Sequence, residues 1–253
     1  MIRFACLVLT AHLFAAAVAA ETPEEIAGDR LVERRITCEL PSVNVRLVGP
    51  DGWGADGWGP DGPLLPLIVV PAPSGAVVPG ARAWATYSMG VLVRTDPSEG
   101  RRAFVAELAL ADAGGASEAD DRYLAALARA VGVLTDDYPV DPASVVVVGE
   151  GDGAGLAWQL LARAPESYAA GVFIAGRLSP QVAERLTGTP LWIFQGDRDG
   201  GEAIARTRAV VSAVWAAGGT NARYTEIREP GPVWVPAWQE KRLLPWLFSQ
   251  SRE

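Results

Sequence analysis

Four carboxylates follow two short apolar segments in the second half of the chain: Glu150, Asp152, Asp197 and Asp199. The carboxyl ends of neighbouring parallel strands meet at one edge of an α/β sheet, where such proteins bind their ligands. Carboxylate oxygens at that edge suit a hard cation or a cationic ligand. The alternative is that these residues serve tight turns and a helix start, which favour aspartate. The spacing alone leaves both interpretations open.

Nucleophilic chemistry is restricted by the scarcity of histidine. The chain has one histidine, His12, and it lies in an apolar N-terminal run. A serine nucleophile ordinarily needs a neighbouring base, most often histidine. Lys241 is the only lysine, which disfavours serine–lysine and Schiff-base chemistry. Cys38 is the only cysteine after residue 20, so we expect no intramolecular disulfide and no cysteine-based zinc site. We predict no cofactor and, apart from the cation alternative above, no metal centre.

Residues 1–20 have the features of a secretory signal peptide. Arg3 precedes an apolar stretch that ends in small residues at Ala19 and Ala20. We therefore expect export to the periplasm or the exterior, and no membrane span in the mature chain, because no later stretch is long and apolar enough. The net charge of −8 repels nucleic acid and anionic lipid. The expected partner is a small molecule, a glycan or a protein.

Residues 21–64 are predicted to form an N-terminal arm, a hairpin and a loop. Residues 21–35 are charged and are expected to be a short helix or an extended arm. Residues 36–40 and 43–48 alternate on either side of Pro41, which favours an antiparallel hairpin. A near-repeat of Asp-Gly-Trp-Gly follows, and its glycines and prolines indicate a loop. Its Trp53 and Trp58 either form an exposed aromatic surface for a glycan, peptide or partner, or fold back onto the domain.

Residues 65–253 alternate short apolar runs with amphipathic stretches. Runs that are β-branched and apolar throughout are typical of strands buried on both faces of a parallel sheet; they occupy residues 67–70, 90–93, 145–148, 171–174 and 191–194. Helices are expected at residues 119–135, 153–164, 180–186, 203–217 and 237–249. This alternation predicts one α/β domain with a doubly wound, mostly parallel sheet flanked by helices. Four tryptophans fall on the pattern and are expected in the core: Trp158, Trp192, Trp215 and Trp246.

A glycine-rich strand–turn–helix pattern surrounds the first two carboxylates. Ser144-Val-Val-Val-Val-Gly149 leads through Glu150-Gly151-Asp152 to Gly153, and Pro190-Leu-Trp-Ile-Phe-Gln-Gly196 precedes Asp197-Arg198-Asp199. This arrangement resembles the nucleophile-elbow region of exported esterases of the α/β-hydrolase superfamily. The similarity is greatest to the feruloyl-esterase, polyhydroxybutyrate-depolymerase and phospholipase/carboxylesterase-like groups. It covers roughly the C-terminal half of the chain and implies the α/β-hydrolase fold and, by descent, ester hydrolysis.

Two of the three catalytic positions implied by this resemblance are empty. The family elbow reads G-x-S-x-G; here Gly149 and Gly153 keep the outer glycines, but Gly151 stands at the serine position. Asp199 matches the position of the acid. The histidine is expected after the strand that follows the acid, and this chain has Pro232 there. The catalytic set is therefore degenerate, with no intact triad.

The oxyanion hole implied by the resemblance is also altered. The family commonly has a His-Gly pair after the strand at residues 67–70, whereas this chain continues Pro71-Ala72-Pro73, and proline has no N–H to donate. The second donor would be the N–H of Asp152. The carboxylates of Glu150 and Asp152 would then flank a site that must stabilise negative charge, which opposes acyl transfer.

Two hypotheses of different class follow. The sequence favours an exported α/β-hydrolase-fold homologue that lacks serine-hydrolase activity, a pseudoenzyme with a ligand-binding or interaction role. The alternative is a carboxylic-ester hydrolase, esterase- or depolymerase-like, that uses a non-standard site.

Overall fold

The computed structural model describes residues 30–36, 42–50, 62–73, 102–110, 121–228 and 233–252. Side chains of residues 30–36, 234 and 235 lie outside this description. Residues 1–20, which are predicted to be a signal peptide, the predicted loop with Trp53 and Trp58, and the predicted strand at residues 90–93 also lie outside it. The elements are β1 (Arg30–Ile36), β2 (Val43–Gly49), β3 (Leu65–Pro71), β4 (Phe104–Leu110), α2 (Asp121–Asp137), β5 (Val140–Glu150), α3 (Asp152–Arg163), η3 (Pro165–Ser167), β6 (Ala170–Ile174), η4 (Pro180–Leu186), β7 (Leu191–Gly196), α4 (Gly201–Ala216), β8 (Ala222–Ile227), α5 (Trp234–Trp238) and α6 (Leu243–Phe248).

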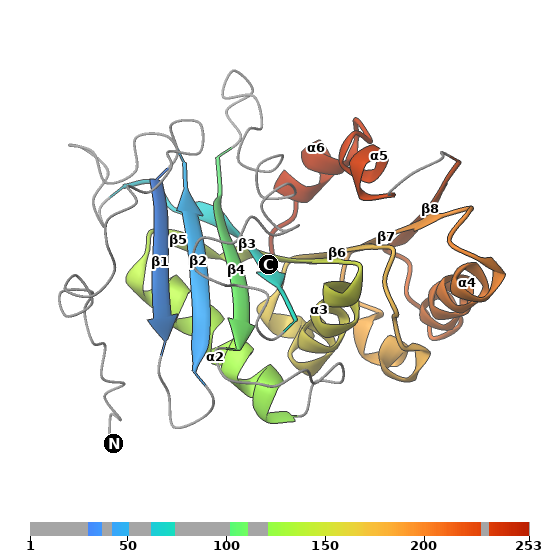
Figure 1. The fold of residues 1–253 in the computed structure, drawn as a ribbon, viewed down its shortest axis with the longest axis horizontal. Helices are drawn as coiled ribbons and strands as arrows, with labels where there is room; N and C mark the ends of the chain where they lie inside the picture. Colours follow the sequence, from blue (N-terminus) through green and yellow to red (C-terminus); the bar gives the residue numbers. More distant parts are fainter. Residues whose placement is uncertain are drawn as a thin grey trace, which may run out of the picture.

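The described strands form one twisted sheet in the order β1-β2-β4-β3-β5-β6-β7-β8. β1 pairs with β2 and β2 with β4 in antiparallel fashion, and every later pair is parallel. Helices α2, α3 and α4 cover one face, and α5 and α6 lie on the other (Figure 1). The predicted mostly parallel α/β sheet with an N-terminal antiparallel hairpin is confirmed.

The central strand shows why the sequence reads as a continuous apolar run. Val145 and Val147 of β5 pack on the face that carries α2, α3 and α4. Val146 and Val148 pack on the opposite face, with residues of α5 and α6. Because successive side chains of a strand point to opposite faces, a strand covered on both sides must be apolar throughout. The strand stops where α3 begins, at the glycine-rich segment.

The structure corrects two predicted elements and adds one strand that the sequence patterns do not predict. The first hairpin strand is Arg30–Ile36, so it lies earlier than residues 36–40 and within the segment expected to be a helix or arm. β1 is an edge strand, where charged residues are tolerated, and its charged sequence concealed it. β4 was not predicted because Glu107 interrupts its apolar run. Its carboxylate is buried and paired with Arg46 of β2, with 3.1 Å between Nη1 and Oε2.

The predicted C-terminal helix at residues 237–249 is two short helices, α5 and α6. Pro245 explains the break. In a continuous helix the ring of Pro245 would clash with the carbonyl of Lys241. Proline also has no backbone N–H that could donate a hydrogen bond to this carbonyl. In the first turn of α6 the missing N–H costs nothing, because those groups have no intrahelical partner. Among the described helices, none has the length and apolar character needed to cross a membrane.

The predicted core tryptophans separate into two kinds. Trp158 of α3 is fully buried, meets Phe173 edge-on with 5.1 Å between ring centroids, and donates its indole N–H to the carbonyl of Ser179 at 2.8 Å. Trp192 is buried as well. The expectation for Trp215 is wrong, because its side chain is 51% exposed at the end of α4.

Replacing Trp158 with alanine should lower the free energy of unfolding by about 3–5 kcal/mol, because it leaves a cavity and an unpaired carbonyl. The same substitution at the exposed Trp215 should cost less than about 1 kcal/mol. Denaturant unfolding followed by circular dichroism measures both. Equal losses at the two positions would contradict the assignment of Trp158 to the core.

Candidate functional site

The turn between β5 and α3 has the backbone of a nucleophile elbow. β5 ends at Glu150, α3 begins at Asp152, and Gly151 alone reverses the chain with φ 52° and ψ −121°. Its N–H donates to the carbonyl of Ile174 in β6 at 2.9 Å, and its carbonyl accepts from the N–H of Ala154 at 3.2 Å. A side chain at positive φ is strained, and the elbow motif places a serine in such a strained turn. The turn is present, but it carries no functional group.

The outer glycines of the motif are required by packing. A Cβ atom on Gly149 would lie 2.5 Å from the Cα atom of Ala154, in α3. A Cβ atom on Gly153 would lie 2.7 Å from the carbonyl oxygen of Pro71, at the end of β3. A Cβ atom on Gly151 would meet no heavy atom within 4 Å. The turn therefore has room for a side chain at the position where the family has its nucleophile.

The end of β3 supplies no free backbone donor in its described part. The N–H of Ala72 is used in the sheet, where it donates to the carbonyl of Leu108 at 2.8 Å. The carbonyl of Ala72 accepts a hydrogen bond from the hydroxyl of Tyr123 at 2.6 Å. Pro73 follows and has no N–H, and residues 74–101 lie outside the described part. Ala72 and Pro73 therefore contribute nothing to an oxyanion hole.

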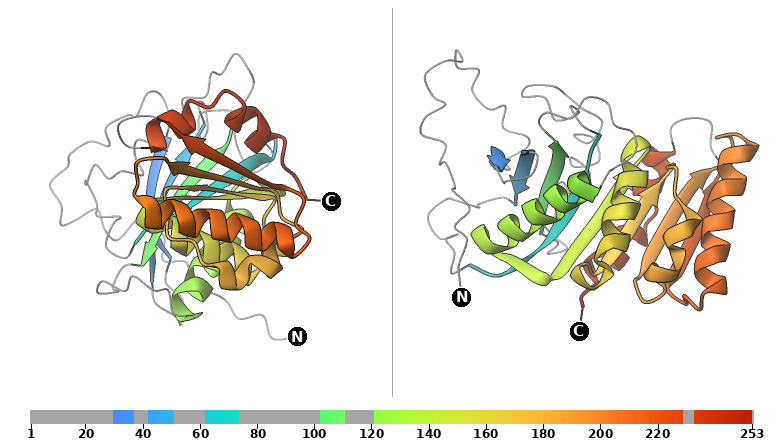
Figure 2. Two further views of the ribbon diagram at one scale, coloured as in Figure 1. Left: turned by 90° about the vertical axis from the view of Figure 1, so that its right-hand side faces the viewer. Right: turned by 90° about the horizontal axis from the view of Figure 1, so that it is seen from below.

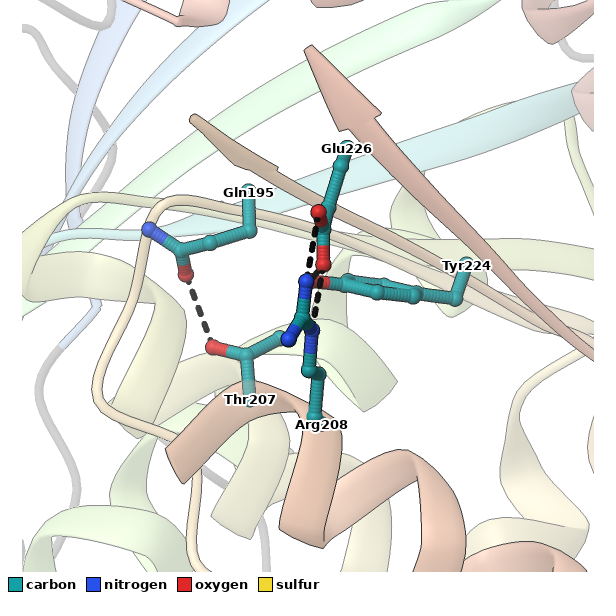
Figure 3. Close-up of polar contacts among 5 residues, drawn as sticks. All are labelled: Gln195, Thr207, Arg208, Tyr224 and Glu226. Atoms are coloured by element: carbon teal, nitrogen blue, oxygen red, sulfur yellow. Dashed lines mark hydrogen bonds and ion pairs between the residues drawn. The ribbon is translucent and has the colours of Figure 1, made fainter. Parts of the chain in front are cut away.

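Asp199, at the position of the acid, is bound to its own turn. Its Oδ2 accepts the backbone N–H of Gly196 at 3.0 Å and the side-chain N–H of Gln195. Gln195 is buried in β7, and its Oε1 accepts from the hydroxyl of Thr207 in α4 at 2.7 Å (Figure 3). The carboxylate thus closes the turn after β7 and ties that turn to α4. Such a role matches the turn interpretation of the acidic residues.

The other three acidic residues do not complete a cation site. Glu150 accepts a hydrogen bond from the indole N–H of Trp238 in α5. Asp152 is exposed in the first turn of α3, where the helix dipole favours a negative charge. Asp197 is exposed in the turn after β7. Across the described ranges, no three histidine, cysteine or acidic side chains are grouped as metal ligands, so the cation interpretation finds no support.

Three sequence-based expectations fall outside the described residues. These are Pro232, at the position of the histidine, and Trp53 and Trp58 of the Asp-Gly-Trp-Gly repeat. Sequence patterns give no sign of Trp238, whose indole reaches Glu150 beside the elbow, or of Thr207, which donates to Gln195. Neither residue has a local motif, because each contact joins two different elements of the fold. The described site therefore consists of an elbow without a side chain, two acids bonded within the protein, Glu150 and Asp199, and two exposed acids, Asp152 and Asp197.

A matched pair of alanine variants tests the elbow. Gly149→Ala should cost about 3 kcal/mol or more in unfolding free energy, because its Cβ would meet the backbone of α3. Gly151→Ala should cost less, about 1–3 kcal/mol, since the new atom enters open space and the only penalty is the strained backbone conformation at positive φ. Urea unfolding of both variants measures the difference. A larger loss at Gly151 than at Gly149 would contradict this account of the turn.

Comparison with known proteins defines the fold. No protein-family model matches the chain, and no curated protein does. Among solved structures, a thermostable esterase is similar with 22% identity and a TM-score of 0.72 over 90% of this chain; the chain spans 64% of that protein's length. A ferulic acid esterase is similar with 12% identity and a TM-score of 0.65, over 87% of this chain and 98% of that one. A fungal esterase from Rhizomucor miehei has 14% identity and a TM-score of 0.63, over 88% of this chain and 83% of the other. With the strand order and the elbow, these similarities show that the chain has the α/β-hydrolase fold, of the kind found in esterases.

Proposed function

We propose that this chain is an exported protein that keeps the α/β-hydrolase scaffold without serine-hydrolase activity and acts by binding a small molecule, a glycan or a protein. The observation that carries the proposal is the elbow itself. Gly151 has the backbone conformation and the open space of a nucleophile position, yet it has no hydroxyl. A loss confined to that residue leaves the fold intact and removes the reacting atom.

The size of the expected loss supports the proposal. Removing serine or histidine from such a triad lowers turnover by about 10⁶, and removing both costs little more, because the residues act as a unit. An intact oxyanion hole could retain roughly 10³–10⁴ over water. Here Ala72 uses its N–H within the sheet and Pro73 has none, so that residual catalysis is also weakened.

The charges around the elbow point the same way. Glu150 and Asp152 lie on either side of Gly151, and acyl transfer builds up a negative charge close to that residue. Two like charges about 4 Å apart repel by about 1 kcal/mol in water and about 4 kcal/mol near a protein surface. The surroundings of the elbow therefore oppose the transition state that the fold serves in hydrolases.

The alternative is a carboxylic-ester hydrolase that uses a non-standard site. The observation in its favour is that the similar solved structures are esterases. Fold alone does not carry an activity, because unrelated functions share this scaffold. The sequence also supplies no histidine after His12, and export of the chain through residues 1–20 would remove even that one.

The test uses the mature protein, purified to homogeneity, with simple aryl esters and an activated fluorophosphonate probe. The expected results are ester hydrolysis at the buffer rate and no labelled serine by mass spectrometry, because neither a nucleophile nor a base is present at the elbow. The Gly151→Ser/Pro232→His double variant returns a hydroxyl and an imidazole to the two empty positions. Its rate should equal or exceed that of the wild type.

Gly151→Ala is the matched control, because it adds a side chain at the elbow without a hydroxyl. Circular dichroism confirms that each variant is folded. Many turnovers per molecule by the wild-type protein, retained in Gly151→Ala, would overturn the proposal and favour the alternative. Labelling of any wild-type serine at a rate above that of the unfolded chain would do the same.

A further inference from the structure

β8 is the last strand of the sheet, and its outer edge is open in the described part of the chain. It pairs with β7 on one side only. Figure 2 shows this end of the sheet facing the viewer in its left panel, with α4 below the strand. An open strand edge presents unpaired N–H and carbonyl groups that can bind another strand.

The register with β7 decides which backbone groups point outward. The N–H of Leu191 donates to the carbonyl of Asn221, and the N–H of Asp197 donates to the carbonyl of Ile227, both at 3.0 Å. In a parallel pair, every second residue of a strand directs its N–H and its carbonyl to the neighbouring strand, and the residues between them direct these groups away. Tyr224 and Glu226 therefore turn their N–H and carbonyl groups to the open edge.

Ala222 also directs its N–H and its carbonyl to the open edge, but its carbonyl already accepts a hydrogen bond. The indole N–H of Trp215, at the end of α4, donates to that carbonyl at 3.2 Å. The indole itself is 51% exposed. Trp215 therefore marks where the open part of the edge begins and leaves Tyr224 and Glu226 as the residues that can pair.

The charged side chains of β8 are held within their own chain and away from the edge. Glu226 forms an ion pair with Arg208 of α4, with Nε–Oε1 2.6 Å and Nη2–Oε2 2.9 Å, and accepts the hydroxyl of Tyr224 at 2.8 Å (Figure 3). The Arg208 guanidinium, and then the Tyr224 hydroxyl, lower the pKa of the Glu226 carboxyl, while burial chiefly raises the pKa of Tyr224 to about 12. On the other face, Arg223 lies 5.1 Å from the ring centroid of Trp192.

The opposite edge of the sheet contrasts with β8. β1 carries Arg30, Glu33, Arg34 and Arg35 in seven residues, and charges along an edge strand discourage pairing with another chain. β8 has no proline, and its two charged residues, Arg223 and Glu226, are engaged by Trp192 and Arg208 of the same chain. The two edges therefore differ in the protection that their sequences supply.

We propose that β8 pairs antiparallel with β8 of a second copy of this chain, with Tyr224 opposite the partner's Glu226 and Thr225 on the two-fold axis. In this register the outward N–H and carbonyl groups of both residues find partners. Shifting the axis to Tyr224 would require the carbonyl of Ala222, which Trp215 occupies. Shifting it to Glu226 would set two carboxylates directly opposite each other, which is unfavourable.

Self-complementarity singles out a second copy as the partner. An antiparallel two-fold contact places the same patch on both subunits. Each outward N–H group of one β8 therefore faces an outward carbonyl group of the other β8. The same register brings the exposed Trp215 beside the partner's Arg228, a pairing of aromatic face and cation. The contact involves one strand and one helix end, so it belongs to the small, weak class of interfaces.

Disulfide cross-linking tests the register. Residues that face each other in a non-hydrogen-bonded antiparallel pair have Cα atoms about 4.5 Å apart, within reach of a disulfide. In a Cys38→Ser background, Thr225→Cys should form a covalent dimer under mild oxidation. Arg223→Cys is the matched control, because its two copies would lie about 13 Å apart along the strands. No cross-linking at 225, or equal cross-linking at 223, would overturn the register.

Sedimentation equilibrium tests the association itself, over about 1–200 µM protein. The wild type should show a reversible dimer. Glu226→Pro removes the outward N–H without touching the bonds to β7 and should raise the dissociation constant about tenfold or more. Glu226→Ala, which keeps the N–H, separates that effect from loss of the ion pair with Arg208. A monomeric wild type at all concentrations, or equal constants for the proline and alanine variants with both folded by circular dichroism, would refute the proposal.

Discussion

The close approach of α3 to β5 is the constraint on which the rest of this site depends. Gly149 and Gly153 have no room for a side chain, because the backbones of α3 and β3 lie where a Cβ would stand. Gly151, between them, has free space but a positive φ. The scaffold therefore demands two glycines for packing, and it makes no packing demand on the third position. A serine there contributes chemistry and costs strain, about 1–3 kcal/mol for an L-residue in this sparsely populated φ/ψ region. Glycine at 151 removes that strain and leaves the sheet and helix as they were.

The mostly parallel sheet and its helices could be predicted from local patterns, because strands buried on both faces must be apolar and helices must be amphipathic. β5, β6, β7 and the helices between them were predicted in this way. β4 was missed because a buried ion pair, Arg46–Glu107, placed a charge inside a strand. β1 was placed too late because its sequence is charged, and the C-terminal helix was predicted as one element because Pro245 was overlooked. Each error arises where tertiary packing or a single proline overrides the pattern.

The candidate site was harder to predict than the fold. The motif identified Gly151 and Asp199, because a nucleophile elbow and the acid after β7 have fixed places along the chain. What the side chains do was not visible in the sequence. Asp199 binds Gly196 and Gln195, and Glu150 binds Trp238, through contacts whose partners are set by the three-dimensional arrangement. Four acids close in sequence thus suggested one ligand site, whereas two of them form bonds within the protein: Asp199 closes the turn after β7 and Glu150 bonds to α5.

These internal bonds bear on how such a site evolves. A catalytic centre leaves polar groups without partners in the protein so that they can bind a substrate. The missing hydrogen bonds lower the stability of the fold. At this edge of the sheet, the acid after β7 closes a turn and the acid before Gly151 holds α5 in place. If the chain is not a serine hydrolase, as we propose, no transition state requires these carboxylates to remain available, and they can form bonds that stabilise the fold. The same reasoning explains why the elbow persists: its geometry follows from the packing of α3 against β5, and that packing is needed with or without chemistry.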